Sequence, residues 1–573
     1  MTGKGIGKGL THYGDEGFSK FLRTAFVKSQ GFTEAELERP IVGIFNTYSE
    51  LNTCHRGFKE LVQAVRRGVL EAGGLPVEVP TISLGEPYLH PTSMLFRNLM
   101  AVDTEEMIRA QPLDAAVLMG GCDKTVPAQL MGAASANVPA VSLVAGPMMT
   151  GSFQGERLGA CTDCRRLWGE YRGGRIGAEA IGEIGGRLMP TAGTCMVMGT
   201  ASTMACVTEA LGMMVPGGAS APAAFADRLR AGVETGAVAV RLAERGLTPA
   251  QIMTPRAFEN AARVLLAIGG STNGMIHLTA IAGRLGIALD PALFDRLSEE
   301  TPLLVNLKPS GAYYMEDFHK AGGMRVLLQE LKPKLNLDCM TVTGQTLGQW
   351  LGEDQAYPAW QDVVFPAAKP LQEKGGLVVL RGNLCPDGAV LKRSAASPAL
   401  MKHAGRAVVF SGLDDLAARV DDAALDVRPE DILVLQNAGP IGAPGMPESG
   451  YLPIPKKLAR QGVKDMVRIS DARMSGTAFG TIVLHVAPEA AVGGLLGLVR
   501  SGDRIELDVD ERRLELKVDA AELERRRAQW RPPALPGQDT ARGYLRLHLE
   551  QVEQANLGCD LKFLRPPVKV TLK

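Results

Sequence analysis

The sequence predicts an α/β protein of two domains. The first, residues 1–369, is expected to be a parallel-sheet α/β domain with helices on both faces. The second, residues 370–573, is expected to be β-rich and barrel-like. Three observations predict this. A chain of 573 residues is too long for one ordinary hydrophobic core, its first third alternates strand and helix patterns, and its last third holds short strand-like segments.

The N-terminal domain begins with a buried-strand pattern, "PIVGIF", at 40–45. A helix is predicted next, because apolar residues recur at helical spacing until Gly73-Gly74 ends the pattern. These residues are Phe58, Leu61, Val62, Val65 and Val69. Further strands are predicted at 77–85, 115–120 and 138–146, with helices at 93–111 and 126–137 between them; 198–214 and 222–285 read as mostly helical. Repeated β-α-β units predict a parallel sheet.

The C-terminal domain follows a linker-like stretch, "VVFPAAKPLQEKGG", at 363–376. Short strands are predicted at 376–384, 406–410 and 431–436. The segment "RIELDVDERRLELKV", at 504–518, alternates apolar and polar residues around "DE", which predicts a hairpin.

Charge and composition exclude several classes of function. Lys and Arg together number 62, as do Asp and Glu, so no net field favours nucleic acid or a membrane surface as a partner. No stretch approaches the ~18 apolar residues needed to cross a bilayer, and the N-terminus lacks an apolar signal region. We therefore expect a cytoplasmic protein with a small-molecule substrate. Its nine scattered cysteines are predicted to be thiols or metal ligands.

Three of those cysteines lie in loops predicted at one edge of the parallel sheet. Cys54 and Cys122 each follow a predicted strand, and Cys195 lies in a Gly/Thr-rich loop before a helix. Ligands bind beyond the carboxyl ends of such strands. Three thiolates suit an iron–sulfur cluster with one open iron position, which can act as a Lewis acid. Each cysteine taken alone is more often a small buried residue.

Polar residues beside these cysteines could hold a second metal. Asp123 and Lys124 directly follow Cys122 in "GGCDKT", and Glu86 follows another strand. Together with Glu448, in the Gly/Pro-rich stretch 436–450, the carboxylates are hard oxygen donors of the kind Mg²⁺ prefers. On local grounds Glu448 could equally be a solvated loop charge.

Two further stretches leave alternatives open. Ser475 and Thr477, in "RMSGTAFG", could simply cap a helix. Cys161 and Cys164 form a CxxC, "CTDC", which is typical of zinc or redox sites. Because no second CxxC or CxxH accompanies it, we interpret the pair as structural or incidental. The remaining cysteines are assigned to packing: Cys206, Cys339, Cys385 and Cys559.

Five motifs in one order resemble the family of dihydroxy-acid and sugar-acid dehydratases. They are "GGCDKT", "PTAGTCMVMGTAST", "GGSTNGMIHLTAIA", "GAPGMPE" and "SDARMSGTAFGTIVLHVAPEAAVGG", within a resemblance that runs from about residue 15 to 520. The resemblance implies a [2Fe–2S] cluster on Cys54, Cys122 and Cys195. It implies Mg²⁺ on four residues: Glu86, Asp123, Glu448 and Lys124 as a carbamate (N6-carboxylysine). It also implies Ser475 as an alkoxide base with Thr477 beside it, and a homodimer or homotetramer.

The implied reaction is dehydration of a 2,3-dihydroxy carboxylic acid to a 2-keto-3-deoxy acid. Around Glu86 the chain reads "SLGEPYLHPTSMLFRNLM", not the Asp-Gly "SDGI"-like motif of the branched-chain amino-acid enzymes. We therefore expect a sugar acid such as arabinonate, xylonate or gluconate as the substrate, with dihydroxy-acid dehydratase as the alternative. A phosphogluconate substrate is disfavoured because no added basic cluster is present. Two alternatives from other classes are a non-catalytic iron–sulfur sensor or scaffold and a zinc hydrolase using Cys161 and Cys164.

Overall fold

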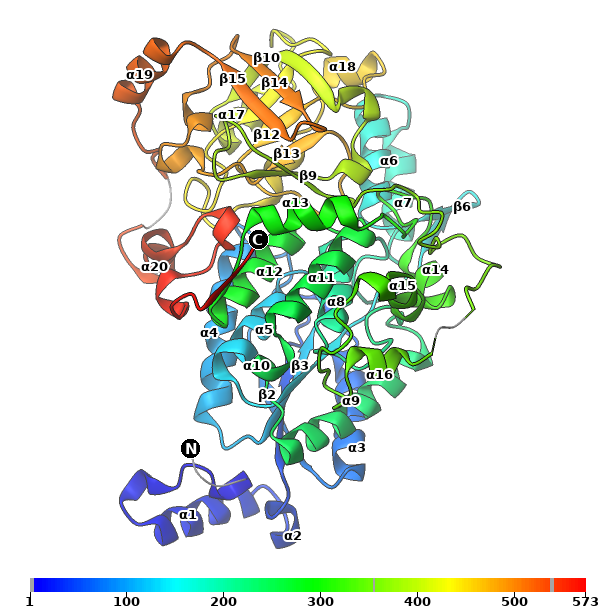
Figure 1. Cartoon of the computed structure of the whole chain (residues 1–573), viewed down its shortest axis with the longest axis vertical. Coiled ribbons are helices and arrows are strands. Elements are labelled where there is room, and N and C mark those ends of the chain that lie inside the picture. The colour runs from blue at the N-terminus through cyan, green and yellow to red at the C-terminus, as the bar shows by residue number, and fades with distance from the viewer. Residues whose placement is uncertain (1–4, 354–355, 536–539) are drawn as a thin grey trace.

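The N-terminal domain is built on a four-stranded parallel sheet in the order β2-β1-β3-β4. A computed structural model describes residues 5–353, 356–535 and 540–573 (Figure 1). The strands are β1 (Ile41–Asn46), β2 (Leu75–Pro80), β3 (Ala115–Gly120) and β4 (Ala140–Val144). The predicted parallel sheet is confirmed. The predicted strand 77–85 ends early, at Pro80, because the chain leaves the sheet there to form the loop that carries Glu86.

Helices cover both faces of this sheet, as predicted. On one side α3 (Phe58–Glu71) packs against α9 (Ala226–Arg245), and on the other α4 (Ser93–Ala110) packs against α5 (Thr125–Ala136) (Figure 1). The apolar residues that predicted α3 are buried against the sheet. A Cβ at Gly68 would lie 1.9 Å from the Val233 carbonyl oxygen, so glycine is needed for α3 and α9 to approach so closely.

Shorter elements complete this domain. The helices are α1 (Glu16–Lys28), α2 (Glu34–Leu37), α6 (Thr162–Arg172), α7 (Ala178–Arg187), α8 (Thr200–Ala210), α10 (Pro249–Ile252), α11 (Pro255–Ala267), α12 (Asn273–Arg284), α13 (Pro291–Glu300), α14 (Met315–Lys320), α15 (Gly323–Leu331) and α16 (Leu347–Leu351). A small hairpin joins β5 (Gly151–Phe153) to β6 (Glu156–Leu158). Among the described residues, no helix is both long and apolar enough to span a membrane.

The C-terminal domain is an eight-stranded, nearly closed sheet in the order β15-β14-β10-β11-β12-β13-β9-β8. The strands are β8 (Val378–Leu380), β9 (Ala389–Leu391), β10 (Lys402–Phe410), β11 (Ile432–Leu435), β12 (Arg468–Ser470), β13 (Ile482–Leu484), β14 (Arg504–Asp508) and β15 (Arg513–Lys517). Backbone bonds of 2.8 Å from Arg381 to Arg512 and from Leu514 to Arg381 join its two ends. The predicted barrel and the 504–518 hairpin are confirmed.

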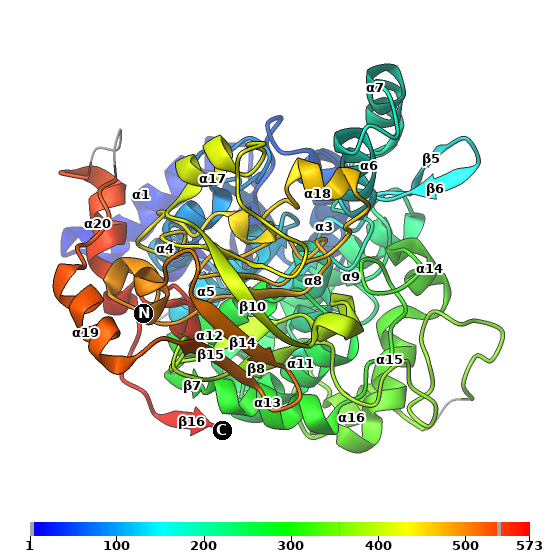
Figure 2. The same ribbon diagram turned by 90° about the horizontal axis from the view of Figure 1, so that it is seen from above.

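The barrel sits over one end of the N-terminal domain, above α11, α12 and α13 (Figures 1 and 2). Its own helices are α17 (Leu413–Arg419), α18 (Lys456–Arg460) and α19 (Ala520–Gln529). This placement brings barrel loops against the loops that follow the parallel strands.

The last part of the chain leaves the barrel and returns to the first domain. After α20 (Gly543–Gln551), strand β16 (Val570–Leu572) pairs in parallel with β7 (Ile287–Leu289) of the N-terminal domain (Figure 1). The fully buried Arg284 donates to Asp560 at 2.6 and 3.0 Å. The C-terminal segment is thus packed into the N-terminal domain through both a strand pair and a buried ion pair.

Candidate active site

The carboxyl ends of the parallel strands bring the predicted cysteines together. Cys54 follows β1 and Cys122 follows β3, and these strands are neighbours. Cys195 arrives from the loop before α8, which is fixed at this edge by two backbone bonds: Thr194 N–H donates to Gly146 O at 2.9 Å, and Met148 N–H donates to Thr194 O at 2.8 Å.

The thiols at this edge form two groups. Cys54 hydrogen-bonds Cys122, and that contact together with burial raises the pKa of the Cys122 thiol. In the second group Cys161 contacts both Cys164 and Cys195, with 3.9 Å between the Sγ atoms of Cys161 and Cys195. Within the described ranges, no three His, Cys, Asp or Glu side chains are grouped closely enough to hold a single metal ion. Two groups of thiols at one edge fit a two-iron cluster better than one tetrahedral zinc.

His55 holds the Cys122 loop in place. Its Nε2 accepts from the Cys122 backbone N–H at 2.9 Å, while its Nδ1 lies 2.8 Å from the Thr47 carbonyl oxygen. Burial lowers the pKa of His55 to about 4, so at neutral pH the ring is uncharged and can donate at Nδ1 while accepting at Nε2. The imidazole therefore connects the end of β1 to the loop that carries the site.

Three carboxylates surround the fully buried amine of Lys124. The Nζ atom lies 2.6 Å from Asp123 Oδ2, 3.2 Å from Glu448 Oε1 and 3.5 Å from Glu86 Oε2. Glu448 comes from the barrel and the other residues from the parallel sheet. Burial and Arg473 favour the neutral amine, yet the carboxylates outweigh them and raise the pKa of Lys124. All four residues predicted for the Mg²⁺ site are therefore brought together.

Arg473 links the carboxylates from the two domains. Its buried guanidinium donates to Glu448 Oε1 at 2.5 Å and to Thr92 Oγ1 at 2.6 Å, and lies 3.4 Å from Glu86 Oε1. Although burial opposes ionisation of Glu86, the charges of Lys124 and Arg473 hold its pKa well below the usual value. Both glutamates are thereby oriented toward one point.

The donor types and the charge of this cluster are those of a Mg²⁺ site, but its three carboxylates are grouped around Lys124 Nζ and not closely enough to hold an ion by themselves. With Lys124 as an ammonium, the three carboxylates and the two cations, Lys124 and Arg473, have a net charge of minus one. With Lys124 as a carbamate and one Mg²⁺ bound, the net charge is the same. Changing the Lys124 ammonium to a carbamate also replaces a hydrogen-bond donor by an oxygen ligand for the metal, which an ammonium cannot provide.

The Ser475 loop lies on the N-terminus of α8. Ser475 Oγ is 2.8 Å from Thr477 Oγ1 and 3.4 Å from the Thr477 backbone nitrogen. A Cβ at Gly476 would lie 2.7 Å from the Thr200 backbone nitrogen, so only glycine permits this approach. The partial positive charge of a helix N-terminus favours an anion there, which suits an alkoxide.

Comparison with known proteins shows the family of the chain. Residues 39–350 match the family model described as "Dihydroxy-acid/6-phosphogluconate dehydratase N-terminal", and residues 362–559 match its C-terminal counterpart. The chain belongs to this dehydratase family. It is therefore a hydro-lyase, acting on a sugar acid or a related dihydroxy acid, and the non-catalytic and zinc-hydrolase alternatives are set aside.

Similar dehydratases act on several acids. An L-arabonate dehydratase of Azospirillum brasilense is 48% identical over 559 residues, 96% of each chain. An L-arabinonate dehydratase of Rhizobium leguminosarum bv. trifolii (strain WSM2304) is 47% identical over 558 residues, 96% of this chain and 95% of its own. A 6-deoxy-6-sulfo-D-gluconate dehydratase of Pseudomonas putida is 45% identical over 535 residues, 93% and 92% of the two chains. Relatives named dihydroxy-acid dehydratase match at lower identity, for example 37%.

Sequence reasoning missed three buried residues of the dehydratase: His55, Arg473 and Lys392. Lys392 donates from Nζ to the Gly476 carbonyl oxygen at 3.4 Å, and burial lowers its pKa to about 7. The sequence feature that could have pointed to each of them is weak: a basic residue inside a motif or at the end of an apolar run.

The "CTDC" segment also belongs to this region of the dehydratase. Thr162 Oγ1 donates to the Thr477 carbonyl oxygen at 2.9 Å, and Cys161 contacts Cys195. These contacts place the segment beside both the Cys195 loop and the Ser475 loop.

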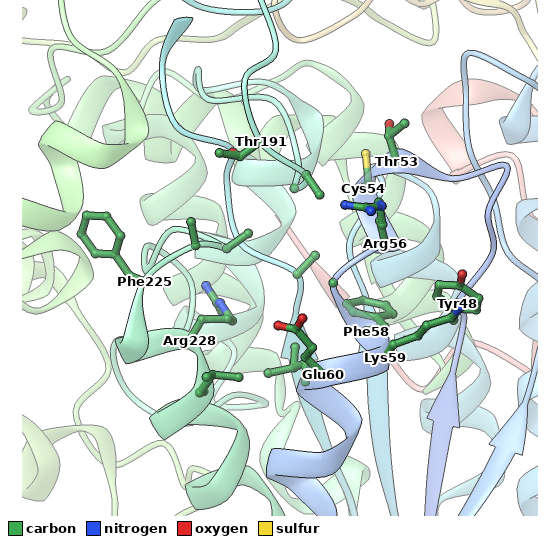
Figure 3. A pocket seen from close by; sticks show the side chains of 18 of the residues that line it. Tyr48, Thr53, Cys54, Arg56, Phe58, Lys59, Glu60, Thr191, Phe225 and Arg228 are labelled. Carbon is green, nitrogen blue, oxygen red and sulfur yellow. The ribbon is translucent and has the colours of Figure 1, made fainter.

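A cleft of about 780 Å³ opens beside Cys54 (Figure 3). Its walls carry Arg56 and Lys59 on one side and Arg228 on the other, with Glu60 between them. The cleft brings open space to the predicted cluster-binding edge of the dehydratase.

Proposed function

We propose that this dehydratase removes water from a C5 or C6 aldonate to give a 2-keto-3-deoxy acid. The observation that carries the proposal is the convergence of thiols, carboxylates and the Ser475 loop at one sheet edge. The names of the relatives at 45–48% identity, which include arabinonate and sulfogluconate dehydratases, support the sugar-acid branch. The sequence around Glu86 supports it independently.

The proposed cofactors are a [2Fe–2S] cluster and Mg²⁺. Cys54, Cys122 and Cys195 would hold the cluster, and the Lys124 cluster of carboxylates would hold the magnesium. When bound, the iron would supply a Lewis acid for the leaving 3-hydroxyl, and Mg²⁺ would supply charge near the carboxylate and 2-hydroxyl of the substrate.

Ser475 is the proposed base. Its Oγ would take the proton from C2, helped by the N-terminus of α8 and by the Thr477 hydroxyl 2.8 Å away. Lys392, at the Gly476 carbonyl, adds a basic group behind the same loop. Arg473 would keep Glu86 and Glu448 in register while the substrate binds.

Substrate preference tests the proposed branch. We expect a higher kcat/KM for at least one C5 or C6 aldonate than for 2,3-dihydroxyisovalerate, measured anaerobically by 2-keto acid formation. A Ser475→Ala preparation controls for contaminating enzymes. A higher kcat/KM for 2,3-dihydroxyisovalerate would move the protein to the dihydroxy-acid branch while keeping the reaction type.

Cysteine substitutions test the proposed cluster. Cys54→Ser, Cys122→Ser and Cys195→Ser should each abolish the visible absorption of the purified protein together with its activity, because each removes one of three thiolate ligands. Cys161→Ser and Cys164→Ser should bleach it much less. Iron and acid-labile sulfide analysis provides the measurement. Loss of colour only in the 161 and 164 variants would refute the ligand assignment.

We also propose a homodimer or homotetramer. In support, α1 stands away from the body of the domain and leaves three phenylalanines exposed: Phe18, Phe21 and Phe26 (Figure 1). An apolar helix face of this kind is typical of protein–protein contact.

A further inference from the structure

We propose that Cys161 is a fourth thiolate at the cluster site, sharing an iron with Cys195 until the substrate hydroxyl displaces it. The proposal rests on the proposed function, because it presumes a cluster on Cys54, Cys122 and Cys195. It assigns a role to a cysteine that those three ligands leave unexplained.

The distance between the sulfurs of Cys161 and Cys195 carries the argument. Cys161 Sγ and Cys195 Sγ are 3.9 Å apart. Two thiolates bound at about 2.3 Å to one tetrahedral metal lie about 3.8 Å from each other. A disulfide would need about 2.05 Å. The two sulfurs are therefore already at the separation of ligands on one metal.

The pairing of the thiols points to the same assignment. A [2Fe–2S] cluster bound by four cysteines takes two thiolates on each iron. Cys54 and Cys122 already form one such pair. Cys195 would be left alone on the second iron, and the thiol that lies beside it is Cys161.

The chain around Cys161 is anchored from both sides. Cys161 is the residue directly before α6, and the next residue, Thr162, bonds the Ser475–Thr477 loop. Asp163 then accepts from Gly159 N–H at 2.8 Å and from the Tyr314 hydroxyl at 3.0 Å. These contacts fix the Cys161 main chain relative to Tyr314 and to the loop of the proposed base.

Cys164 provides the matched control. It lies one helical turn along α6, contacts Cys161, and packs against the apolar cluster of Leu158, Leu167 and Ile184. Its substitution therefore perturbs the same helix without removing the sulfur beside Cys195.

The exchange involves ligands and protons but no electron transfer. The Cys161 thiol would give its proton to solvent as its sulfur binds the iron. When the 3-hydroxyl of the substrate binds, an iron–oxygen bond would replace the iron–sulfur bond of Cys161, and the released thiolate would take a proton from solvent. In the resting enzyme the thiolate would cover the iron against water and dioxygen.

The test uses the full-length protein purified anaerobically, as wild type, Cys161→Ser, Cys164→Ser and Cys195→Ser. Cys161→Ser should retain iron and sulfide near the wild-type level. Its visible bands and the electron paramagnetic resonance of its reduced cluster should shift, and the colour should fade several-fold faster in air. Cys164→Ser should match the wild type in all of these. Adding arabinonate to the wild type should shift the spectrum in the same way as Cys161→Ser does. Adding it to Cys161→Ser should cause no further shift of this kind, because the thiolate is already absent.

A second measurement needs no substitution. Iodoacetamide should leave Cys161 of the wild-type holoprotein unmodified without substrate and alkylate it when an aldonate is bound, as read by peptide mass spectrometry. The proposal would be overturned if the spectra of Cys161→Ser were identical to those of the wild type. It would also be overturned if Cys161 were alkylated to the same extent with and without substrate. Wild-type protein that holds no iron and sulfide after anaerobic reconstitution would instead overturn the proposed function itself.

Discussion

Ser475→Ala should lower turnover by about 10²–10⁴-fold, the usual cost of losing a general base, while both metal centres survive. The substitution removes one oxygen from a loop whose other contacts are made by the backbone and by neighbouring side chains, so the carboxylates and thiols should keep their positions. Exchange of the substrate C2 proton with solvent deuterium should disappear together with turnover, because both need the same proton transfer.

Two controls make the Ser475→Ala experiment decisive. The visible spectrum and the Mg²⁺ content of Ser475→Ala should equal those of the wild type, which excludes an indirect loss of the cofactors. Thr477→Ala should cost less, because Thr477 acts through its 2.8 Å contact with Ser475. If Ser475→Ala keeps most of its activity with intact centres, another group takes the proton, and a Mg²⁺-bound hydroxide becomes the next candidate.

Replacing Lys124 should be comparably severe. Lys124→Ala removes the side chain on which three partly buried carboxylates converge, so like charges are left facing one another. We expect Mg²⁺ affinity and kcat/KM to fall by more than the ~10–100-fold that the loss of a group merely supporting a ligand costs. Isothermal titration with Mg²⁺ and steady-state kinetics measure the two effects.

A comparison of two Lys124 variants separates a carbamate from an ammonium. Lys124→Arg keeps the positive charge but forms no carbamate, so it should be as inactive as Lys124→Ala. Short carboxylic acids such as acetate or propionate should partly restore Lys124→Ala, because they can place an oxygen donor in the vacated space, and should not restore Lys124→Arg. Near-native activity in Lys124→Arg would show that the residue acts as a cation.

Carbamylation requires a neutral amine, whereas the surrounding carboxylates raise the pKa of Lys124. A cation bound among those carboxylates would oppose this effect, since like charges disfavour the ammonium. Metal binding and carbamylation are therefore expected to occur together, and bicarbonate should speed activation of the metal-free protein by Mg²⁺.

Much of the fold could be predicted because its signals are local. The helical spacing of apolar residues in α3 and the alternation in β14 and β15 are visible within a few residues. Strand ends were less predictable. The segment 376–384 looked like one strand, but only Val378–Leu380 pairs, since the chain turns to close the barrel.

The site likewise contains residues that local sequence reveals and residues that it does not. The cysteines and carboxylates are recognisable because they stand in Gly-rich motifs after strands. Arg473 is not, because its role depends on Glu86, 387 residues away in the chain. Cys161 lies 34 residues from Cys195 with no motif that joins them. Contacts of this kind are set by packing between distant segments, which residue spacing does not encode.

The return of the C-terminal segment bears on how the protein is made. Arg284 is synthesised 276 residues before its partner Asp560, and β7 long before β16. At about 5–20 residues per second on the ribosome, roughly 15–55 s separate the synthesis of Arg284 from that of Asp560. Glu105, made earlier, already offers Arg284 a carboxylate at 3.1 Å, but β7 lacks its partner strand until the C-terminal segment is made. This side of the N-terminal domain is therefore completed by residues that are synthesised after the barrel.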